Sequence, residues 1–397
     1  MRSGRFGRDV AKMSAPRGDG RRAPWGAFES EMSPMADRNH IERVRAQLAA
    51  SDCDAVLIKS KTMKKYLGTL TGSGCKVLVT RERAYLILDG RYVNEAHERE
   101  RTLELVEHAQ GESYLPYLKR LLEAEGARRV GVEADQMLVG EYRRVAALGF
   151  EVVLLDEEIP LMRIIKDADE VAHLQRAIDL TDEIYEEVVS RLRLGMTEFE
   201  ISALLHYHSY LRGAEAMSFD TIVGTGPRSA LPHGRPTGRV VQPHDAVLID
   251  FGIQYEGYQS DMTRVVFMGE PEPEMRRIYE VVLEAHLAGI DAMRAGAVAE
   301  DVDRAARDVI ERAGFGENFN HGLGHGIGIG NDSELPLLRP GSKTVLANGM
   351  IMSCEPGVYV DGVGGVRIED DVLIDGGVGR PLNHTPKELR IIPVKEA

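Results

Sequence analysis

The chain has 397 residues, which is long enough for two or three domains with a large buried core. Its hydrophobic content of 43% and charged content of 28% are typical of a globular protein, and its net charge of −14 disfavours nucleic acid or an anionic membrane as a partner. No apolar stretch approaches the roughly 20 residues of a membrane span. Cys53, Cys75 and Cys354 are widely spaced, so we expect no disulfides and a cytoplasmic location.

Residues 1–34 are rich in Arg, Gly, Pro and Ser and lack the apolar core of a signal peptide. We expect a disordered tail, and whether it belongs to the native protein stays open. A mitochondrial presequence is a weaker alternative, because Asp9, Asp19, Glu29 and Glu31 depart from the acid-poor composition of such segments.

Residues 35–158 form the first predicted domain. Ile41, Val44 and Leu48 recur at helical spacing, and short apolar runs bounded by turn residues indicate strands. The alternation of the two predicts an α/β domain with a mixed sheet. The further predicted helices are 91–100, 114–123 and 140–148, and the predicted strands are 55–58, 76–80, 84–88, 103–106, 129–133 and 151–155.

Residues 159–397 form the second predicted domain. Asp167 with Glu170, and Thr197 with Glu200, are capping boxes that begin two helices. We expect helices that surround a strongly curved antiparallel sheet. The predicted helices are 167–194, 197–213, 272–293 and 298–313, and the strand-like segments are 221–223, 321–330, 350–359 and 366–373.

A β-hairpin is predicted over Val247–Arg264, where apolar runs flank a turn at Tyr255–Gly257. Each strand carries one aspartate, Asp250 or Asp261, within an otherwise apolar pattern. Burying an unpaired carboxylate is costly, so two that face each other need a cation between them. For this pair alone, a solvent-exposed position at the strand ends is an equal alternative.

A second hairpin repeats this arrangement. Met350–Val360 and Gly365–Val372 flank a glycine-rich turn, and each strand again carries one acid, Glu355 or Glu369. Converging carboxylates cannot all stay ionised without a metal, because like charges repel strongly at short range. The repetition therefore favours a metal site over unrelated strand-end acids.

The segment His321–Gly328 supplies imidazole nitrogen. Each glycine costs about 1 kcal/mol in a helix relative to alanine, so we expect an extended strand or loop, with one of His321 and His325 outside the metal's direct ligands. Carboxylates with one imidazole suit Mn²⁺ first, and Co²⁺, Zn²⁺ or Fe²⁺ as alternatives. Two such ions about 3.5–4 Å apart would activate a water for hydrolysis.

Six motifs in succession resemble the pita-bread metallopeptidases of the aminopeptidase P and prolidase group. The resemblance runs from Met35 onward, and YLGTLTGSG and LDGRY resemble that family's creatinase-type N-terminal domain. It implies an α/β N-terminal domain followed by an α+β pita-bread catalytic domain with a curved antiparallel sheet. The motifs are LPHGRPT at 231–237, LIDFG at 248–252, SDMTR at 260–264, HGLGHGIG at 321–328, SCEPGVY at 353–359 and GVRIED at 365–370.

The resemblance implies five metal ligands. Asp250 would bind one ion, Asp261 and Glu369 would bridge the pair, and His325 with Glu355 would complete the second ion.

The resemblance also implies catalytic roles. Glu355 would handle protons, His233 would contact the substrate, His321 would lie outside the direct ligands, and Arg367 would orient them. The implied reaction is hydrolysis of an Xaa-Pro bond by a metal-bridging hydroxide, in an aminopeptidase or a dipeptidase that is a homodimer. A hydrolase or lyase acting on a small amidine, amide or betaine-like molecule is the alternative, and a catalytically silent binding module is a third.

One position departs from the family pattern. A further histidine usually follows the metal-binding one by seven residues. Here, counting forward from His325 places Asp332 at that position, whereas counting back from Pro336 places Ser333 there. That histidine is expected to hydrogen-bond the substrate, so its replacement predicts weaker Xaa-Pro turnover with an intact metal site. An acid at Asp332 would favour a cationic substrate group.

Overall fold

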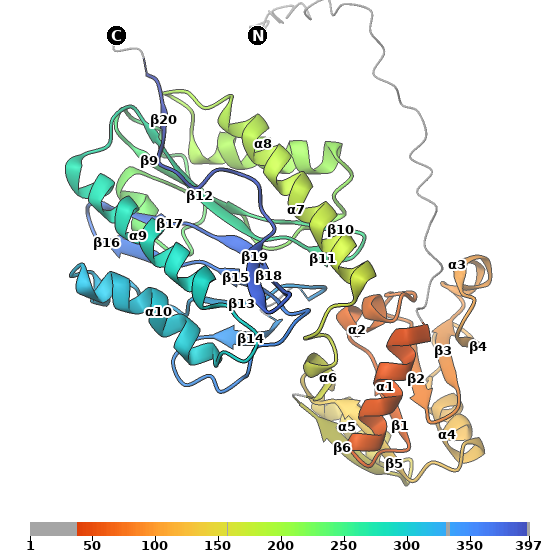
Figure 1. The fold of residues 1–397 in the computed structure, drawn as a ribbon. Coiled ribbons are helices and arrows are strands. Elements are labelled where there is room, and N and C mark those ends of the chain that lie inside the picture. Colours follow the sequence, from red (N-terminus) through yellow and green to blue (C-terminus); the bar gives the residue numbers. More distant parts are fainter. Residues whose placement is uncertain (1–37, 157, 331–333, 395–397) are drawn as a thin grey trace, which may run out of the picture.

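The computed structural model describes residues 38–156, 158–330 and 334–394. The predicted tail over 1–34 and the two positions Asp332 and Ser333 therefore lie outside the described residues. The described chain forms a smaller N-terminal unit and a larger C-terminal unit, which are joined by the segment around the short helix α6 (Glu158–Leu161) (Figure 1). The boundary at residues 158/159 stays a prediction.

The smaller unit is a six-stranded mixed sheet in the order β4-β3-β2-β1-β5-β6. β1 and β3 pair antiparallel with β2, while the β3–β4, β1–β5 and β5–β6 pairs are parallel. Its elements are α1 (Arg38–Ala50), β1 (Ala55–Ile58), α2 (Lys61–Tyr66), β2 (Lys76–Thr80), β3 (Ala84–Asp89), α3 (Val93–Arg99), β4 (Glu104–His108), α4 (Leu115–Ala124), β5 (Arg129–Glu133), the 3₁₀ turn η1 (Ala134–Gln136), α5 (Val139–Ala146) and β6 (Glu151–Leu155).

The expected α/β unit with a mixed sheet is thus confirmed, and the structure adds α2, which the periodicity does not predict. This helix has only six residues, too few for an apolar stripe to be recognisable. Its N-terminus is capped by Ser60, whose hydroxyl accepts a hydrogen bond from the N–H of Met63.

The larger unit has short, mostly antiparallel sheets surrounded by helices, in the strand orders β11-β10-β7, β20-β12-β9-β8, β14-β13-β15-β18-β19 and β16-β17. β20 pairs parallel with β12. The helices are α7 (Ala168–Val189), α8 (Glu198–Leu211), α9 (Pro273–Ala292) and α10 (Ala299–Arg312), with the 3₁₀ turns η2 (Gly226–Ala230) and η3 (Gly316–Asn318). The strands are β7 (Ala216–Met217), β8 (Ile222–Thr225), β9 (Ala246–Phe251), β10 (Ile253–Tyr255), β11 (Tyr258–Gln259), β12 (Met262–Met268), β13 (Gly324–Gly326), β14 (Glu334–Leu338), β15 (Ile351–Cys354), β16 (Gly357–Val360), β17 (Gly364–Arg367), β18 (Asp370–Asp375), β19 (Val378–Pro381) and β20 (Arg390–Ile392).

The hairpin β9/β12 lies at the centre of the larger unit and is buried on both faces. Leu248 and Phe267 belong to the hydrophobic cluster that α9 and α10 cover, whereas Val247 and Val266 belong to the cluster that α7 and α8 cover. Successive side chains of a strand point to opposite faces, so a continuous apolar run is what a strand between two helical layers needs. Figure 1 shows the two helix pairs on opposite sides of these strands.

Both capping boxes are present at the starts of α7 and α8. The predicted end of the first of these helices near Leu194 is wrong, because α7 ends at Val189. Beyond it the backbone leaves the helix to pair with another segment: the N–H of Gly195 donates to the carbonyl of Val241, and the N–H of Val241 donates to that of Met196.

The glycine-rich segment after α10 contains less strand than the 321–330 prediction. Only Gly324–Gly326 forms a strand, with an irregularity between His325 and Gly326. A Cβ on Gly324 would collide with the carbonyl of Ser353, and one on Gly326 with that of Leu335. Glycine is needed here because neighbouring backbones approach this short strand from both sides.

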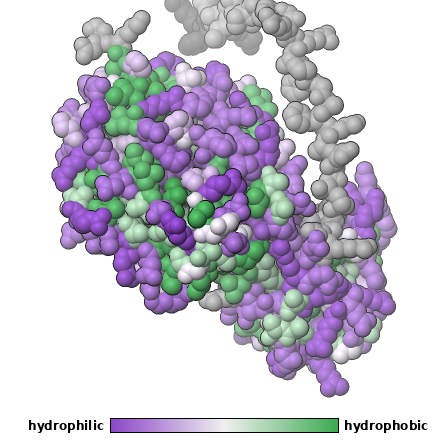
Figure 2. Space-filling view, viewed as in Figure 1, coloured by the Kyte–Doolittle hydropathy of each residue, from purple (hydrophilic) through white to green (hydrophobic). Residues whose placement is uncertain are grey.

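None of the helices in the described part of the chain is long and apolar enough to cross a bilayer. Figure 2 shows hydrophilic residues over most of this face of both units, with hydrophobic residues gathered in the middle of the larger one.

Candidate metal centre

A pocket of about 610 Å³ in the larger unit brings together every site residue that the sequence indicates. These residues come from four regions of the chain, which only the folded sheets bring into one place. They are His233, Asp250, Asp261, His321, His325, Glu355, Arg367 and Glu369.

Three of the four acids lie where a strand is interrupted. Asp261 separates β11 from β12, Glu355 separates β15 from β16, and Glu369 separates β17 from β18, while Asp250 lies inside β9. In the ladder Asp250 pairs with Thr263 and not with Asp261. The two hairpins are thus each broken at the point where they present carboxylates to the pocket.

Asp250, Asp261 and Glu369 each offer a carboxylate oxygen, and these three atoms lie within 4.8 Å of one another. All three side chains are buried. Burial raises the pKa of Asp250, against the opposing effect of Arg367. Burial, reinforced by neighbouring carboxylates, raises the pKa values of Asp261 and Glu369 well above their usual range.

The imidazole of His325 completes this arrangement. Its Nδ1 lies 3.0 Å from the carbonyl oxygen of Gly326, so Nδ1 carries the donated proton and Nε2 presents a lone pair. Nε2 in turn lies 3.7 Å from Asp261 Oδ2 and 3.6 Å from Glu355 Oε1. A nitrogen lone pair that faces carboxylate oxygens in this way needs a cation between the nitrogen and the oxygens.

The donor set fits divalent metal ions. Asp250 Oδ1 and Asp261 Oδ1 are buried side-chain oxygens without a hydrogen-bond partner among the described residues. A buried carboxylate oxygen without a partner is costly, and a hard cation would satisfy both. Carboxylates with one neutral imidazole are ligands that Mn²⁺, Fe²⁺, Co²⁺ and Zn²⁺ accept.

Arg367 is the cation that the fold itself places among these acids. Its Nη2 forms an ion pair with Asp250 Oδ2, and its Nε donates to Thr263 Oγ1 at 3.0 Å. Its Nη1 donates to the hydroxyl of Tyr359 at 2.6 Å. One planar guanidinium thus orients three groups at once.

The hydrogen-bond chain continues from Tyr359 to His321. His321 Nδ1 lies 2.7 Å from the carbonyl of Gly322 and must donate to it, so Nε2 accepts the proton of the Tyr359 hydroxyl at 3.0 Å. Burial lowers the pKa of His321, which favours this neutral form. Burial also raises the pKa of Tyr359 to about 12, which keeps its proton in place.

Sequence reasoning did not single out Thr263 and Ser353, which orient the acids. Thr263 Oγ1 donates to Glu369 Oε2 at 2.6 Å. Ser353 Oγ donates to Glu355 Oε1 at 3.1 Å and accepts the backbone N–H of His325 at 3.0 Å. Spacing along the chain offered a signal, because Thr263 and Ser353 each lie two residues from an acid, Asp261 or Glu355.

Arg264 supports the same region from the opposite face of β12. Its guanidinium is buried, donates to the carbonyl of Glu369, and forms an ion pair of 2.6 Å with Asp370 Oδ1. It also donates to the carbonyl of Thr385 at 2.9 Å. Arg264 therefore ties the backbone at Glu369 to β12 and to the chain near residue 385.

His233 lies on an exposed loop after η2 and lines the pocket. Phe219 and Ile222 add apolar surface to the wall, and Arg235 and Arg339 add positive charge. The position at which the sequence lacks the expected histidine, Asp332 or Ser333, is outside the described residues.

The raised pKa values of the acids predict how the metal-free protein responds to pH. An acid whose pKa is higher in the folded than in the unfolded state stabilises the fold below the unfolded value, about 4, and this contribution is lost as pH rises through the folded value. Urea unfolding of the chelated protein at several pH values measures this, and Asp261→Asn/Glu369→Gln is the comparison. We expect the free energy of unfolding of the unmodified protein to fall more steeply above pH 4 than that of the variant; equal slopes would contradict the assignment.

Comparisons with known proteins identify the family. Residues 172–376 match the model of Metallopeptidase family M24, and residues 40–165 match that of the Creatinase/Prolidase N-terminal domain. The Xaa-Pro dipeptidase of Pyrococcus horikoshii is 34% identical over 358 residues, which cover 88% of this chain and 98% of the relative.

Solved structures extend the likeness to the whole fold. An Xaa-Pro dipeptidase from Bacillus anthracis is 35% identical with a TM-score of 0.85, and the match covers 89% of this chain and 99% of that one. An X-Pro aminopeptidase from Thermotoga maritima is 33% identical with a TM-score of 0.81, over 87% and 100% of the two chains. The pocket of converging acids, the family matches and these likenesses together show that the chain belongs to metallopeptidase family M24, with a creatinase-type N-terminal domain and a pita-bread catalytic domain.

Proposed function

We propose that this metallopeptidase is a di-metal hydrolase that cleaves Xaa-Pro peptide bonds, as an aminopeptidase or a dipeptidase. The observation that carries the proposal is the convergence of buried acids and the Nε2 lone pair of His325 in one pocket, with two carboxylate oxygens left unpartnered. The names of the similar Xaa-Pro dipeptidases and X-Pro aminopeptidase support proline-directed cleavage.

Asp250, Asp261, His325, Glu355 and Glu369 would hold the ions. Two divalent ions held there would supply Lewis acidity and would lower the pKa of a bound water. The metal that we propose is Mn²⁺, because the donors are mostly hard oxygens, and Co²⁺, Zn²⁺ and Fe²⁺ share this preference to different degrees.

The chain's own residues would orient the substrate and move protons. Glu355, fixed through one oxygen by Ser353, would take a proton from the attacking water and pass it to the leaving proline nitrogen. His233 would donate a hydrogen bond to the oxygen of the scissile carbonyl as charge develops there. Arg367 would keep Asp250 and Glu369 in place through its ion pair and through Thr263.

The proposal extends to the state of the protein in the cell. We propose a cytoplasmic homodimer that acts on soluble peptides, with no nucleic-acid or membrane partner. The three free cysteines, which are all buried, support the cytoplasmic location, and the net charge of −14 supports the absence of a nucleic-acid or membrane partner.

The test measures metal content and peptide cleavage on one purified sample. An Xaa-Pro dipeptide, an Xaa-Pro-Xaa tripeptide and an Xaa-Ala dipeptide are offered to the protein after exhaustive chelation and after reloading with Mn²⁺. We expect cleavage of at least one proline peptide, none of the Xaa-Ala control, loss of turnover on chelation and recovery with Mn²⁺. Activity that survives chelation would refute the metal mechanism, and bound metal without turnover of either proline peptide would refute the substrate assignment.

A further inference from the structure

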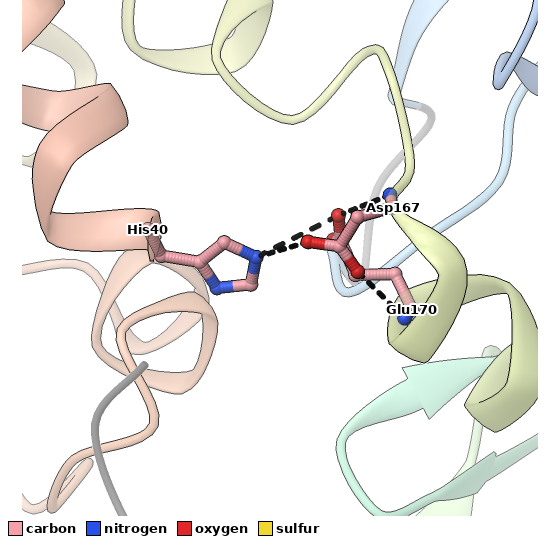
Figure 3. Close-up of side chains that lie close together, drawn as sticks. All are labelled: His40, Asp167 and Glu170. Atoms are coloured by element: carbon pink, nitrogen blue, oxygen red, sulfur yellow. Dashed lines mark hydrogen bonds and ion pairs between the residues drawn. The ribbon is translucent and has the colours of Figure 1, made fainter. Parts of the chain in front are cut away.

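The segment between α6 and the first turn of α7, residues 162–170, carries two clusters of charged side chains, and we call it the linker. The first joins the smaller unit to the start of α7 and consists of His40, Arg43, Asp167 and Glu170; we call it the joint cluster. Figure 3 shows the imidazole of His40, on α1, pointing at the carboxylates of Asp167 and Glu170. His40 Nε2 lies 3.1 Å from Asp167 Oδ2 and 3.7 Å from Glu170 Oε2.

The joint cluster contains its own cation, the guanidinium of Arg43. Arg43 Nη2 lies 3.3 Å from Asp167 Oδ2, and Arg43 Nη1 lies 3.4 Å from Glu170 Oε2. His40 Nδ1 lies 2.6 Å from the carbonyl oxygen of Tyr66, so both ring nitrogens face oxygen atoms. Arg43 and His40 each lie close to both carboxylates, so the cluster is a polar joint between the units.

The second cluster connects the same linker to the pocket. Glu334, at the start of β14, is buried, and its Oε1 lies 3.2 Å from Arg163 Nε. Its Oε2 lies 3.4 Å from the ammonium of Lys166. Burial alone would raise the pKa of Glu334, but Lys166 and Arg163 outweigh that effect and lower it, so the carboxylate is ionised at neutral pH.

The same carboxylate holds a stretch of backbone that borders the metal centre. Glu334 Oε1 accepts the N–H of Ile329 at 3.1 Å and the N–H of Gly330 at 2.9 Å. Gly328 passes so close to Glu334 that a Cβ there would collide with its carboxylate. Residues 327 and 328 line the pocket directly after His325 and Gly326, so we call residues 327–330 the pocket wall segment.

Arg163 extends the contact to the smaller unit. Its Nη1 lies 3.1 Å from the sulfur of Met63, a buried residue of α2. The backbone of Lys166 is also fixed, because its amide N–H donates to the carbonyl of Gly349 at 2.8 Å. A continuous series of contacts thus runs from α2 through the linker and Glu334 to the pocket wall segment.

We propose that Glu334, held by Arg163 and Lys166, is a positioning residue that sets the conformation of the pocket wall segment and thereby the fit of the substrate. In the part of the chain that the structure describes, these side chains do not contact the proposed metal ligands, so they act on substrate binding and not on metal loading. The kinetic part of this inference rests on the proposed function, whereas the structural part does not.

Hydrogen–deuterium exchange tests the structural part. In Lys166→Met the carboxylate loses one of its two cations, and in Glu334→Gln it loses its charge. We expect the amides of Ile329 and Gly330 to exchange about tenfold faster in both variants, because both amides donate to this carboxylate and weakening a hydrogen bond to a charged group eases local opening. Lys166→Arg restores a cation and should return exchange to near the unmodified rate. If both Lys166→Met and Glu334→Gln fold and exchange at the unmodified rate, the proposal is overturned.

The matched control is Arg43→Gln. It weakens the joint cluster but has no contact with the pocket wall segment, so exchange at Ile329 and Gly330 should stay unchanged. Faster exchange there in Arg43→Gln, equal to that in Lys166→Met, would show a general loosening of the units and would overturn the role of Glu334.

Kinetics and metal titration test the effect on substrate. With an Xaa-Pro dipeptide, KM should rise about tenfold in Lys166→Met, with kcat changed less than about twofold, because uniform binding is lost and not transition-state binding. Mn²⁺ titration of the metal-free variant should give the unmodified affinity. A fall in kcat with unchanged KM, or weaker Mn²⁺ binding, would overturn the positioning role. If the unmodified enzyme does not cleave the dipeptide, the proposed function fails while the exchange result still decides the structural claim.

Discussion

Asp261→Asn is expected to lose both metal and turnover. Asparagine keeps the shape of the side chain but removes one of the mutually repelling charges, and with it an oxygen that the ions need. We expect kcat/KM to fall by more than about 100-fold, because loss of even an outer-shell partner costs 10–100-fold. Metal analysis after gel filtration and peptide cleavage on the same sample measure both effects.

The metal-free form of Asp261→Asn should be at least as stable as the unmodified metal-free protein, because burial and its neighbours raise the pKa of Asp261 in the fold. The control is Asp245→Asn, which removes a buried carboxylate from the turn before β9, where it pairs with Arg239 and not with the metal centre. This control should lose stability and keep its metal. Full metal content in Asp261→Asn would contradict the ligand assignment.

Arg367→Met is expected to give the largest loss of stability in the metal-free protein. The substitution leaves Asp250 buried without its ion pair and removes the donors to Thr263 and Tyr359. Removing one partner of a buried pair costs about 3–5 kcal/mol. Urea unfolding in the presence of chelator at pH 7 measures this loss, and turnover should fall with it because Asp250 and Glu369 are no longer oriented.

A double-variant cycle separates the ion pair from simple packing. In Arg367→Met/Asp250→Asn neither charge remains, so most of the lost stability should return. Arg367→Lys keeps a positive charge but cannot make the three directed contacts of a guanidinium. Its free energy of unfolding should therefore lie between those of Arg367→Met and the double variant. Strictly additive losses in the double variant would show that the pair contributes nothing beyond the separate side chains.

Much of the fold follows from local patterns in the chain. The capping boxes at Asp167 and Thr197 begin α7 and α8 as predicted, because a cap depends only on side chains three residues apart. The strands β1, β2, β5 and β6 have the predicted bounds, since each is an apolar run between turn residues. The end of α7 was not predictable, because the chain leaves the helix after Val189, and Gly195 and Met196 beyond it pair with the distant Val241.

The residue types of the candidate site were also readable from the chain. Acids within apolar strand patterns, repeated in two hairpins, indicated a buried cation, and the structure brings them into one pocket. The sequence indicated Arg367 as an orienting group, but it did not indicate that Thr263 lies between Arg367 and Glu369. The Thr263 hydroxyl on Glu369 and the guanidinium of Arg367 on Thr263 join residues 106 and 104 positions apart.

The sequence by itself thus determined most of the elements, the pairing of the two strand segments that carry the acids, and the chemistry of the donors, because these depend on periodicity, turns and the cost of burying charge. Only the tertiary structure decided which oxygen of each acid is already occupied, which nitrogen of His325 and His321 carries the proton, and that the linker reaches the pocket through Glu334. Arg163 and Glu334 are 171 positions apart, and such a contact exists only once both units have packed against the linker. Hydrogen-bond partners of this kind are selected by packing, and packing between distant segments leaves no periodic trace in the sequence.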